Sequence, residues 1–302
     1  MSKMAWNKVE RISLDYAYSY CESIVRRNQE NFTVGSWLLP KKLRPHFFVL
    51  YAYCRYTDNL GDEFRGDSTQ LLRRWLEDLE RCWLDSPRHP IMVALQHTIE
   101  KHQLSQQPFR DLIEANMIDQ VKMRYETFED LLGYCRLSAN PVGRIVMELS
   151  GYEDPKALLC ADAICTALQL SNFWQDVYRD FKIGRIYLPR EDMEMFQVRE
   201  VDLEFCKSST QMKKLMEYQV ERTKSYFKEG LKILGMVDHK LRFELALFSL
   251  GGMEVLKLIE DQSFDVLSKR VVITRMARLK ILYKTIVLIT MSKHRDKGIS
   301  ER

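Results

Sequence analysis

Apolar residues recur at helical spacing along almost the whole chain, and this pattern narrows the possible folds more than any other feature. Only 12 glycines and 8 prolines occur among the 302 residues. A sheet-rich chain of this length needs turn residues more often, so their scarcity favours long helices. No internal repeat and no linker divides the sequence. We therefore predict an all-α fold in a single domain that spans residues 1–302.

Polar and proline-containing breaks mark the expected ends of the helices. The strongly apolar segment 40–63 should form a central helix, and Asp67 or Ser68 is expected to cap the helix that follows it. The remaining breaks separate segments of ordinary helix length. They fall at Ser86–Pro87, His89–Pro90, Gln107–Pro108, Asn140–Pro141, Asp154–Pro155, Leu188–Pro189 and Gly251–Gly252.

The charge balance and the cysteines exclude several classes of protein. The net charge is +4 and no long basic run occurs, so we expect no nucleic-acid partner. The seven cysteines include no C-x-x-C pair, which argues against a disulfide framework or a structural zinc site. The first residues lack the apolar core of a signal peptide, and no uninterrupted apolar run reaches about 18 residues. These features predict a cytoplasmic protein, soluble or peripheral to the inner face of a membrane.

The tail around residues 275–293 is apolar with interspersed cations. Two interpretations are open for it. Such a segment can lie at a membrane surface, or it can be a C-terminal helix that docks on the rest of the fold. We favour docking.

Two aspartates in the predicted central helix lie where carboxylates are costly. Asp58 and Asp62 are four residues apart, so their side chains share one helical face about one turn apart. Like charges at this spacing repel, and the segment before them is strongly apolar. A buried pair of carboxylates without a partner is unfavourable, so a cation is the natural compensation.

The same spacing returns later in the chain. Asn172, Asp176 and Asp180 follow one another at steps of four after another apolar stretch. One such pattern is more often a solvated helical face, but two in apolar surroundings favour a pocket lined by oxygen atoms. Hard divalent cations prefer oxygen ligands, and Mg²⁺ binds through a few carboxylates together with substrate phosphate oxygens.

Residues near these acids fit a diphosphate ligand. Cations lie nearby in the sequence, and Tyr187 lies in an expected loop two residues after Arg185. The segment from Tyr134 to Gly143 places small residues and Asn140–Pro141 where a helix should bend, which could make room for a ligand. A kinked core helix is an equally good interpretation of that segment. The cations are Arg55, Arg179, Lys182 and Arg185.

These motifs resemble the squalene/phytoene synthase family, the head-to-head isoprenoid diphosphate synthases, over about residues 31–282. The resemblance rests on the two aspartate motifs. The second of them is followed by Arg185-Ile186-Tyr187-Leu188-Pro189. Several segments are similar to the hydroxysqualene synthase branch of bacterial hopanoid pathways. They include Glu30-Asn31-Phe32, Trp37-Leu38-Leu39-Pro40, Tyr125-Glu126-Thr127-Phe128, the segment 134–143 and Gln262-Ser263-Phe264.

The resemblance implies an isoprenoid-synthase helical bundle around a central cavity. It also implies an enzyme that converts presqualene diphosphate to hydroxysqualene. Carried over by motif, the metal ligands for Mg²⁺ are Asp58, Asp62, Asp176 and Asp180. The residues that would contact the diphosphate are Arg55, Asn172, Arg185 and Tyr187. Tyr134 matches the active-site tyrosine of the family.

At the expected bend the chain reads Ser138-Ala139-Asn140, more polar than the usual Val-Ala-Gly of the family. This difference suits a reaction that ends by capture of water, which Asn140, Ser138 or Tyr134 could hold. The chain also departs from the family's hydroxyl-rich diphosphate segment at Gln29-Glu30-Asn31-Phe32, which argues against a second diphosphate site. We do not expect NADPH as a cofactor, and Gly251–Gly252 is no dinucleotide fingerprint.

Two alternatives stay open. A sister enzyme would make presqualene diphosphate, squalene or phytoene from farnesyl or geranylgeranyl diphosphate. A non-catalytic helical protein of assembly or membrane-surface function would be of another class, and the intact acidic motifs count against it. Apart from these alternatives, a partner isoprenoid synthase that delivers the substrate would be compatible with the hydroxysqualene reaction.

Overall fold

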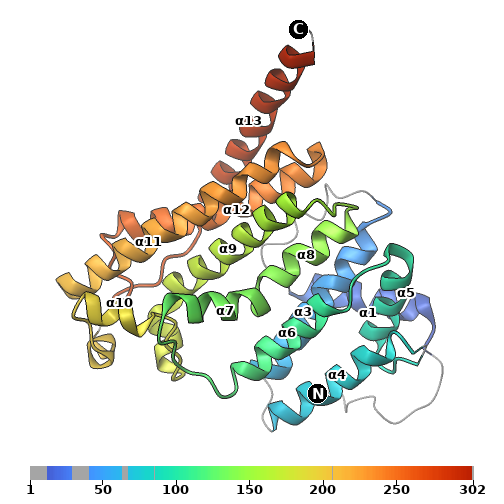
Figure 1. Cartoon of the computed structure of the whole chain (residues 1–302), viewed down its shortest axis with the longest axis horizontal. Helices are drawn as coiled ribbons and strands as arrows, with labels where there is room; N and C mark the ends of the chain where they lie inside the picture. Colours follow the sequence, from blue (N-terminus) through green and yellow to red (C-terminus); the bar gives the residue numbers. More distant parts are fainter. Residues whose placement is uncertain (1–11, 29–40, 63–66, 85, 206, 301–302) are drawn as a thin grey trace. The chain divides into compact units, whose positions relative to one another are not determined.

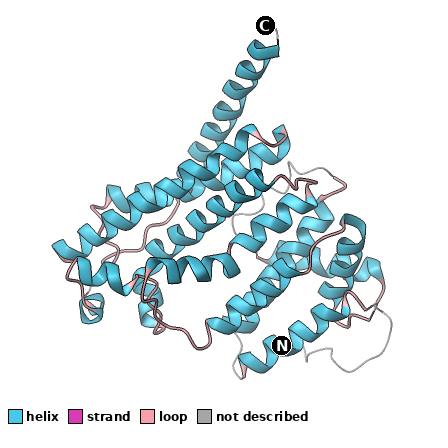
Figure 2. Ribbon diagram, in the orientation of Figure 1, coloured by secondary structure: helices cyan, strands magenta, loops and turns pink. Residues whose placement is uncertain are grey.

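The computed structural model describes residues 12–28, 41–62, 67–84, 86–205 and 207–300, with side chains up to residue 290. All regular structure in these ranges is helical, and they contain no strand (Figure 2). The prediction of an all-α fold is therefore confirmed. The segments Glu30-Asn31-Phe32 and Trp37-Leu38-Leu39-Pro40, which contributed to the family resemblance, lie outside the described residues.

The chain forms two compact units. The first consists of Met1–Val121 and Arg144–Tyr152, and the second of Lys122–Gly143 and Glu153–Arg302. The chain passes from the second unit to the first within helix α8 (Asn140–Leu149). The single domain expected from the sequence stays a prediction.

Helix α3 (Arg44–Asp62) is the centre of the first unit, where it packs against every other helix named here (Figure 1). The Tyr53 hydroxyl donates a hydrogen bond to the Phe109 carbonyl oxygen at 2.7 Å, and Trp75 Nε1 donates to Thr57 Oγ1 at 2.8 Å. The buried face of α3 thus fixes the direction of the opposite face, which carries Asp58. The surrounding helices are α1 (Leu14–Arg27), α4 (Ser68–Arg81), α5 (Pro90–His102) and α6 (Gln107–Ile118).

Helix starts follow the capping chemistry expected from the sequence. The Asp67 carboxylate caps α4 by accepting a hydrogen bond from the Gln70 amide at 2.9 Å. Asp154 caps the longest helix, α9 (Pro155–Lys182), and proline occupies its first position. Such caps satisfy amide groups that have no partner within the helix.

In the second unit, α9 packs against α7 (Phe128–Ser138), α11 (Thr210–Gly230) and α12 (His239–Asp261). Trp174 is fully buried, and its Nε1 donates a hydrogen bond to Thr223 Oγ1 of α11 at 2.8 Å. Among the described helices, α9 is the one whose length and apolar composition would let it cross a membrane. Its contacts on three sides and its carboxylates are those of a core helix. Helix α10 (Arg190–Met195) and α13 (Arg275–Ser300) complete the unit.

The helix break expected at Gly251–Gly252 is wrong, because α12 runs without interruption through both glycines. The reason is packing. A Cβ atom at Gly252 would lie 2.5 Å from Phe227 Cζ and 2.8 Å from Leu168 Cδ2, so the glycine lets α12 approach α11 and α9 closely. A Cβ atom at Gly251 would meet no atom within 4 Å.

These adjacent glycines give a matched test. We expect Gly252→Ala to lower the free energy of unfolding by about 1 kcal/mol, because overpacking costs more than the helix gains. Gly251→Ala should raise it by about 0.5 kcal/mol, since alanine is the better helix former. Urea unfolding followed by circular dichroism measures both. Equal effects of the two substitutions would contradict the packing explanation.

Candidate functional site

The first unit carries one predicted pair of aspartates on α3. Asp58 and Asp62 both keep solvent-accessible surface, one helical turn apart. Protein atoms crowd the Asp58 carboxylate, and this desolvation, with repulsion from Asp62 as a smaller contribution, raises its pKa to about 6. The Arg55 guanidinium, one turn earlier, acts in the opposite direction. A desolvated carboxylate that remains accessible is a suitable ligand for a divalent cation.

Helix α6 and the turn that follows it supply two residues that the sequence interpretation missed, Asn116 and Gln120. Asn116 Nδ2 donates a hydrogen bond to Asp58 Oδ1 at 3.4 Å, and Gln120 Nε2 donates to the Gly61 carbonyl oxygen at 3.2 Å. Gly61 permits this approach, because a Cβ atom there would lie 2.6 Å from Asn116 Oδ1. Asn116 and Gln120 are four residues apart, the same spacing as the aspartates, and this was the signal available in the sequence.

The second unit carries the other predicted motif on α9. Asn172, Asp176 and Asp180 all keep accessible surface, whereas the intervening Phe173 and Val177 are buried. The single helix α9 includes both the apolar stretch and these polar residues, so the face is continuous. The expected row of oxygen atoms is therefore present.

Arg270 is a further residue of this site that the sequence interpretation missed. It follows α12, and its Nη2 donates a hydrogen bond to Asp176 Oδ2 at 3.0 Å while its Nε donates to Oδ1. These hydrogen bonds raise the pKa of the Arg270 guanidinium, and Asp180 contributes to the same shift. Gln175 Nε2 holds the neighbouring backbone by donating to the Val271 carbonyl oxygen at 2.7 Å. A fixed cation thus lies on the second aspartate motif.

The loop after α9 carries the predicted Arg185 and Tyr187. Gly184 has a φ of 86°, which turns the chain sharply at the end of the helix. The loop then pairs with the segment before α7, because the Ile186 amide donates to the Met123 carbonyl oxygen at 3.0 Å. These contacts hold Tyr187 above α9.

Four rings form an aromatic cluster: Tyr125, Tyr134, Phe173 and Tyr187. The Tyr187 ring stacks on Phe173, with centroids 3.9 Å apart and planes at 11°. Tyr134 lies 5.9 Å from the Tyr187 centroid and 6.2 Å from that of Phe173. Tyr125, another residue that we did not assign to the site, lies 5.7 Å from both other tyrosines.

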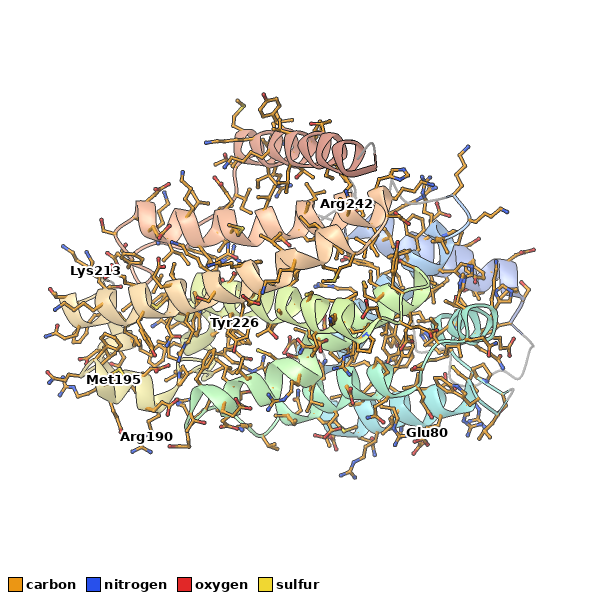
Figure 3. The ribbon with its side chains drawn as sticks, turned by 45° about the horizontal axis from the view of Figure 1, so that its top comes forward. Glu80, Arg190, Met195, Lys213, Tyr226 and Arg242 are labelled. Carbon is orange, nitrogen blue, oxygen red and sulfur yellow. The ribbon has the colours of Figure 1, made fainter. Side chains whose placement is uncertain are left out.

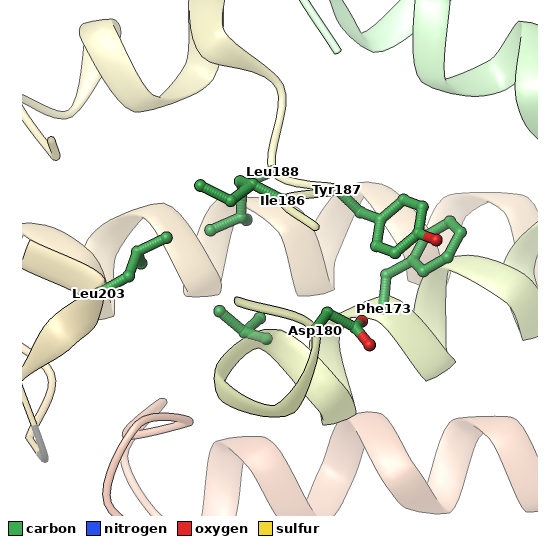
Figure 4. Close-up of a pocket in the computed structure, with 7 residues that line it drawn as sticks. Phe173, Asp180, Ile186, Tyr187, Leu188 and Leu203 are labelled. Atoms are coloured by element: carbon green, nitrogen blue, oxygen red, sulfur yellow. The ribbon is translucent and has the colours of Figure 1, made fainter. Parts of the chain in front are cut away.

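A small pocket adjoins this cluster, with the Asp180 carboxylate beside the two stacked rings (Figure 4). Apolar side chains and one carboxylate therefore meet at the same place. The pocket is lined by Phe173, Val177, Asp180, Ile186, Tyr187, Leu188 and Leu203.

The polar segment at the expected bend lies between α7 and α8. Helix α7 ends at Ser138, and Ala139, with φ −120° and ψ −49°, separates it from α8. Asn140 is buried, and its Oδ1 accepts a hydrogen bond from Thr166 Oγ1 of α9 at 2.9 Å. Ser138 Oγ is also buried and makes no hydrogen bond to any residue that the structure describes. Ser138 lies one turn after Tyr134 and so on the same side of α7.

The arrangement defines a class of protein: an all-α enzyme whose carboxylate-bearing helices and aromatic pocket suit an apolar substrate with an anionic leaving group. Residues 25–277 match the family described as "Squalene/phytoene synthase", and the chain belongs to this family. The family comprises head-to-head isoprenoid synthases.

Solved and curated relatives agree with this assignment. The crystal structure of squalene synthase HpnC from Alicyclobacillus acidocaldarius is 40% identical, with a TM-score of 0.80 over 84% of this chain and 97% of that one. A dehydrosqualene synthase in complex with ligand is 25% identical, with a TM-score of 0.85 over 92% of this chain and 98% of that one. The 15-cis-phytoene synthase of Synechococcus elongatus is 33% identical over 85% of this chain and 88% of its own length.

Proposed function

We propose that this enzyme converts presqualene diphosphate to hydroxysqualene by loss of diphosphate, rearrangement of the carbocation and capture of water. The observation that carries the proposal is the buried Ser138 Oγ, which has no hydrogen-bond partner among the described residues. A buried hydroxyl without a partner is costly, so a bound water is a natural partner for it. The similarity to squalene synthase HpnC supports the substrate class.

Each of the two aspartate motifs, one in each unit, is proposed to bind Mg²⁺ and the leaving diphosphate. Asp58 and Asp62 fit Mg²⁺ in the first unit because they are accessible, close together and like-charged. Asp176 fits a cation in the second unit, because its carboxylate already pairs with the positively charged guanidinium of Arg270. Mg²⁺, when bound, would neutralise charge on the departing diphosphate as a Lewis acid. Arg55, Arg185, Tyr187 and Asn172 are the residues proposed to contact the diphosphate oxygens.

The aromatic cluster is proposed to protect the carbocation. Faces of aromatic rings stabilise positive charge and do not attack it. The stacked Phe173 and Tyr187 line an otherwise apolar pocket, which excludes bulk water while the cation rearranges. One positioned water then completes the reaction, held by Ser138, Asn140 or Tyr134.

Product analysis tests this proposal. Purified enzyme, Mg²⁺ and presqualene diphosphate would be incubated with and without NADPH. We expect an alcohol whose yield does not depend on NADPH. A hydrocarbon formed only with NADPH would overturn the proposal in favour of a squalene synthase.

A second candidate function is a sister reaction of the same family. The curated relatives include phytoene synthases, such as the 33% identical enzyme of Synechococcus elongatus. Incubation with farnesyl or geranylgeranyl diphosphate alone separates the candidates. Turnover of either one would favour the sister enzyme, and inertness favours the hydroxysqualene reaction.

We expect Asn140→Gly to lower the alcohol fraction of the product severalfold, because the change removes the side chain proposed to orient the water. Thr166→Val should shift the product in the same direction by less, since it removes only the hydrogen bond to Asn140 Oδ1. Chromatography of the products measures both. A fully active Asn140→Gly enzyme with an unchanged alcohol fraction would exclude this role.

We also propose that the enzyme works in the cytoplasm at the inner face of the membrane, where its lipid substrate and product reside. A partner synthase that supplies presqualene diphosphate fits this location.

A further inference from the structure

Helix α13 has two apolar faces, and the other residues that the structure describes cover one of them. The covered face packs against α12 and includes the buried residues Ile281 and Thr285. The docking favoured from the sequence is therefore present. Figure 1 shows α13 continuing beyond α12 toward the C-terminus, and Figure 3 shows side chains on its outer side.

The second apolar face is exposed along several turns. Met276, Leu279, Tyr283 and Ile286 follow at spacings of three and four residues, so they form one stripe on the helix. Their side chains are between 48% and 74% exposed. A contiguous exposed stripe of large apolar residues marks an interaction surface.

Cations flank this stripe on both sides. At about 100° per residue, Lys280 and Lys284 lie along one edge and Arg275 along the other, and all three are exposed. The sequence has no Asp or Glu between Asp265 and Asp296. The surface therefore offers apolar side chains in the middle and positive charge at its edges.

We infer that this outward face of α13 binds the surface of an anionic lipid bilayer. An amphipathic helix in this setting buries its apolar stripe at the boundary of headgroups and acyl chains, while flanking Lys and Arg reach the phosphates. A second copy of the chain fits less well, because pairing two such faces would bring cations against cations. This inference rests on the membrane location proposed above and assigns that location to a particular surface. It does not depend on which reaction the enzyme catalyses.

Vesicle flotation in the absence of substrate and Mg²⁺ tests the inference. The full chain should float with vesicles of phosphatidylcholine and phosphatidylglycerol and should bind pure phosphatidylcholine vesicles much less. Lys280→Gln with Lys284→Gln should weaken binding to the anionic vesicles roughly tenfold, since each cation contributes at a charged surface. Leu279→Ser with Tyr283→Ser should weaken it at least as much.

A matched control removes the same charge elsewhere. Lys213→Gln with Lys214→Gln on α11 should leave vesicle binding within about twofold of the original. Failure of the unaltered chain to float, or equal losses in the α13 and α11 variants, would overturn the inference. So would a stable dimer in sedimentation that Leu279→Ser with Tyr283→Ser dissociates, which would make a second copy the occupant.

Turnover is measured separately with substrate in detergent. None of the three pairs of residues belongs to the proposed site, so turnover should be unchanged in every variant, including the two α13 variants whose vesicle binding falls. If the unaltered chain does not form hydroxysqualene, the proposed function is refuted, but the vesicle-binding result still holds.

Discussion

The Asp176→Asn variant is expected to have a kcat/KM about 10³-fold lower than that of the unaltered enzyme. This loss is at the upper end of the range for removal of one electrostatic group from an active site. The substitution removes the negative charge that attracts a divalent cation while nearly preserving shape. It also leaves Arg270 without the carboxylate to which it donates two hydrogen bonds. Affinity for Mg²⁺ depends on the charge and number of the oxygen ligands, so the Mg²⁺ concentration for half-maximal rate should rise as well.

The measurement is steady-state turnover at several Mg²⁺ concentrations, with Asp162→Asn as the matched control. Asp162 lies on the same helix, 14 residues earlier and hence about 21 Å along the axis. Its substitution should leave kcat/KM almost unchanged. Thermal unfolding of Asp176→Asn should also change little, because its ion pair with Arg270 is partly exposed. Full activity of Asp176→Asn would refute the assignment of the second motif.

Glu244→Gln should raise the free energy of unfolding by about 2 kcal/mol at pH 8 and leave it unchanged near pH 4. Glu244 is buried in α12, its Oε1 meets no hydrogen-bond partner among the described residues, and burial raises its pKa to about 7. Between about pH 4.5 and 7 the folded state therefore holds a proton that the unfolded state has lost. Stability of the unaltered protein falls as the pH rises through this window, and above it the full cost remains. Glutamine stays neutral and avoids the cost.

Denaturant unfolding of both proteins at a series of pH values measures this effect. Glu200→Gln is the control of opposite sign, because a hydrogen bond from the Arg124 guanidinium lowers the pKa of Glu200. That substitution should cost a little stability at neutral pH and nothing in strong acid. Parallel pH profiles for the unaltered protein and Glu244→Gln would show that Glu244 is not the buried acid described.

The sequence predicted most helix starts, because these depend on local chemistry. Asp67 and Asp154 lie beside the amides that they cap, so neighbouring residues determine the outcome. The helix break predicted at Gly251–Gly252 was wrong because the role of these glycines is not determined locally. Their effect depends on Phe227 and Leu168, which belong to other helices, and no local rule distinguishes a helix-breaking glycine from one that permits close packing.

The residues of the candidate site show the same difference between local patterns, which the sequence reveals, and contacts between distant residues, which it does not. The carboxylates were found because a spacing of four residues places them on one helical face wherever the helix lies. Asn116 and Arg270 were missed because they meet Asp58 and Asp176 across 58 and 94 residues of sequence. The roles assigned to Tyr134, Ser138 and Asn140 stay predictions, although the structure places Tyr134 in the aromatic cluster.

Arg270 pairs with Asp176 but lies 94 residues later in the chain, and this separation matters while the enzyme is being synthesised. A ribosome completes all four aspartates and the aromatic cluster long before it reaches Arg270. During synthesis the emerging chain therefore contains Asp176 before Arg270, the arginine that pairs with it, has been added. Messages cut short after α12 would yield polypeptides with every acidic motif intact but lacking this cation. The timing of translation thus determines when the charge balance of the second motif is complete.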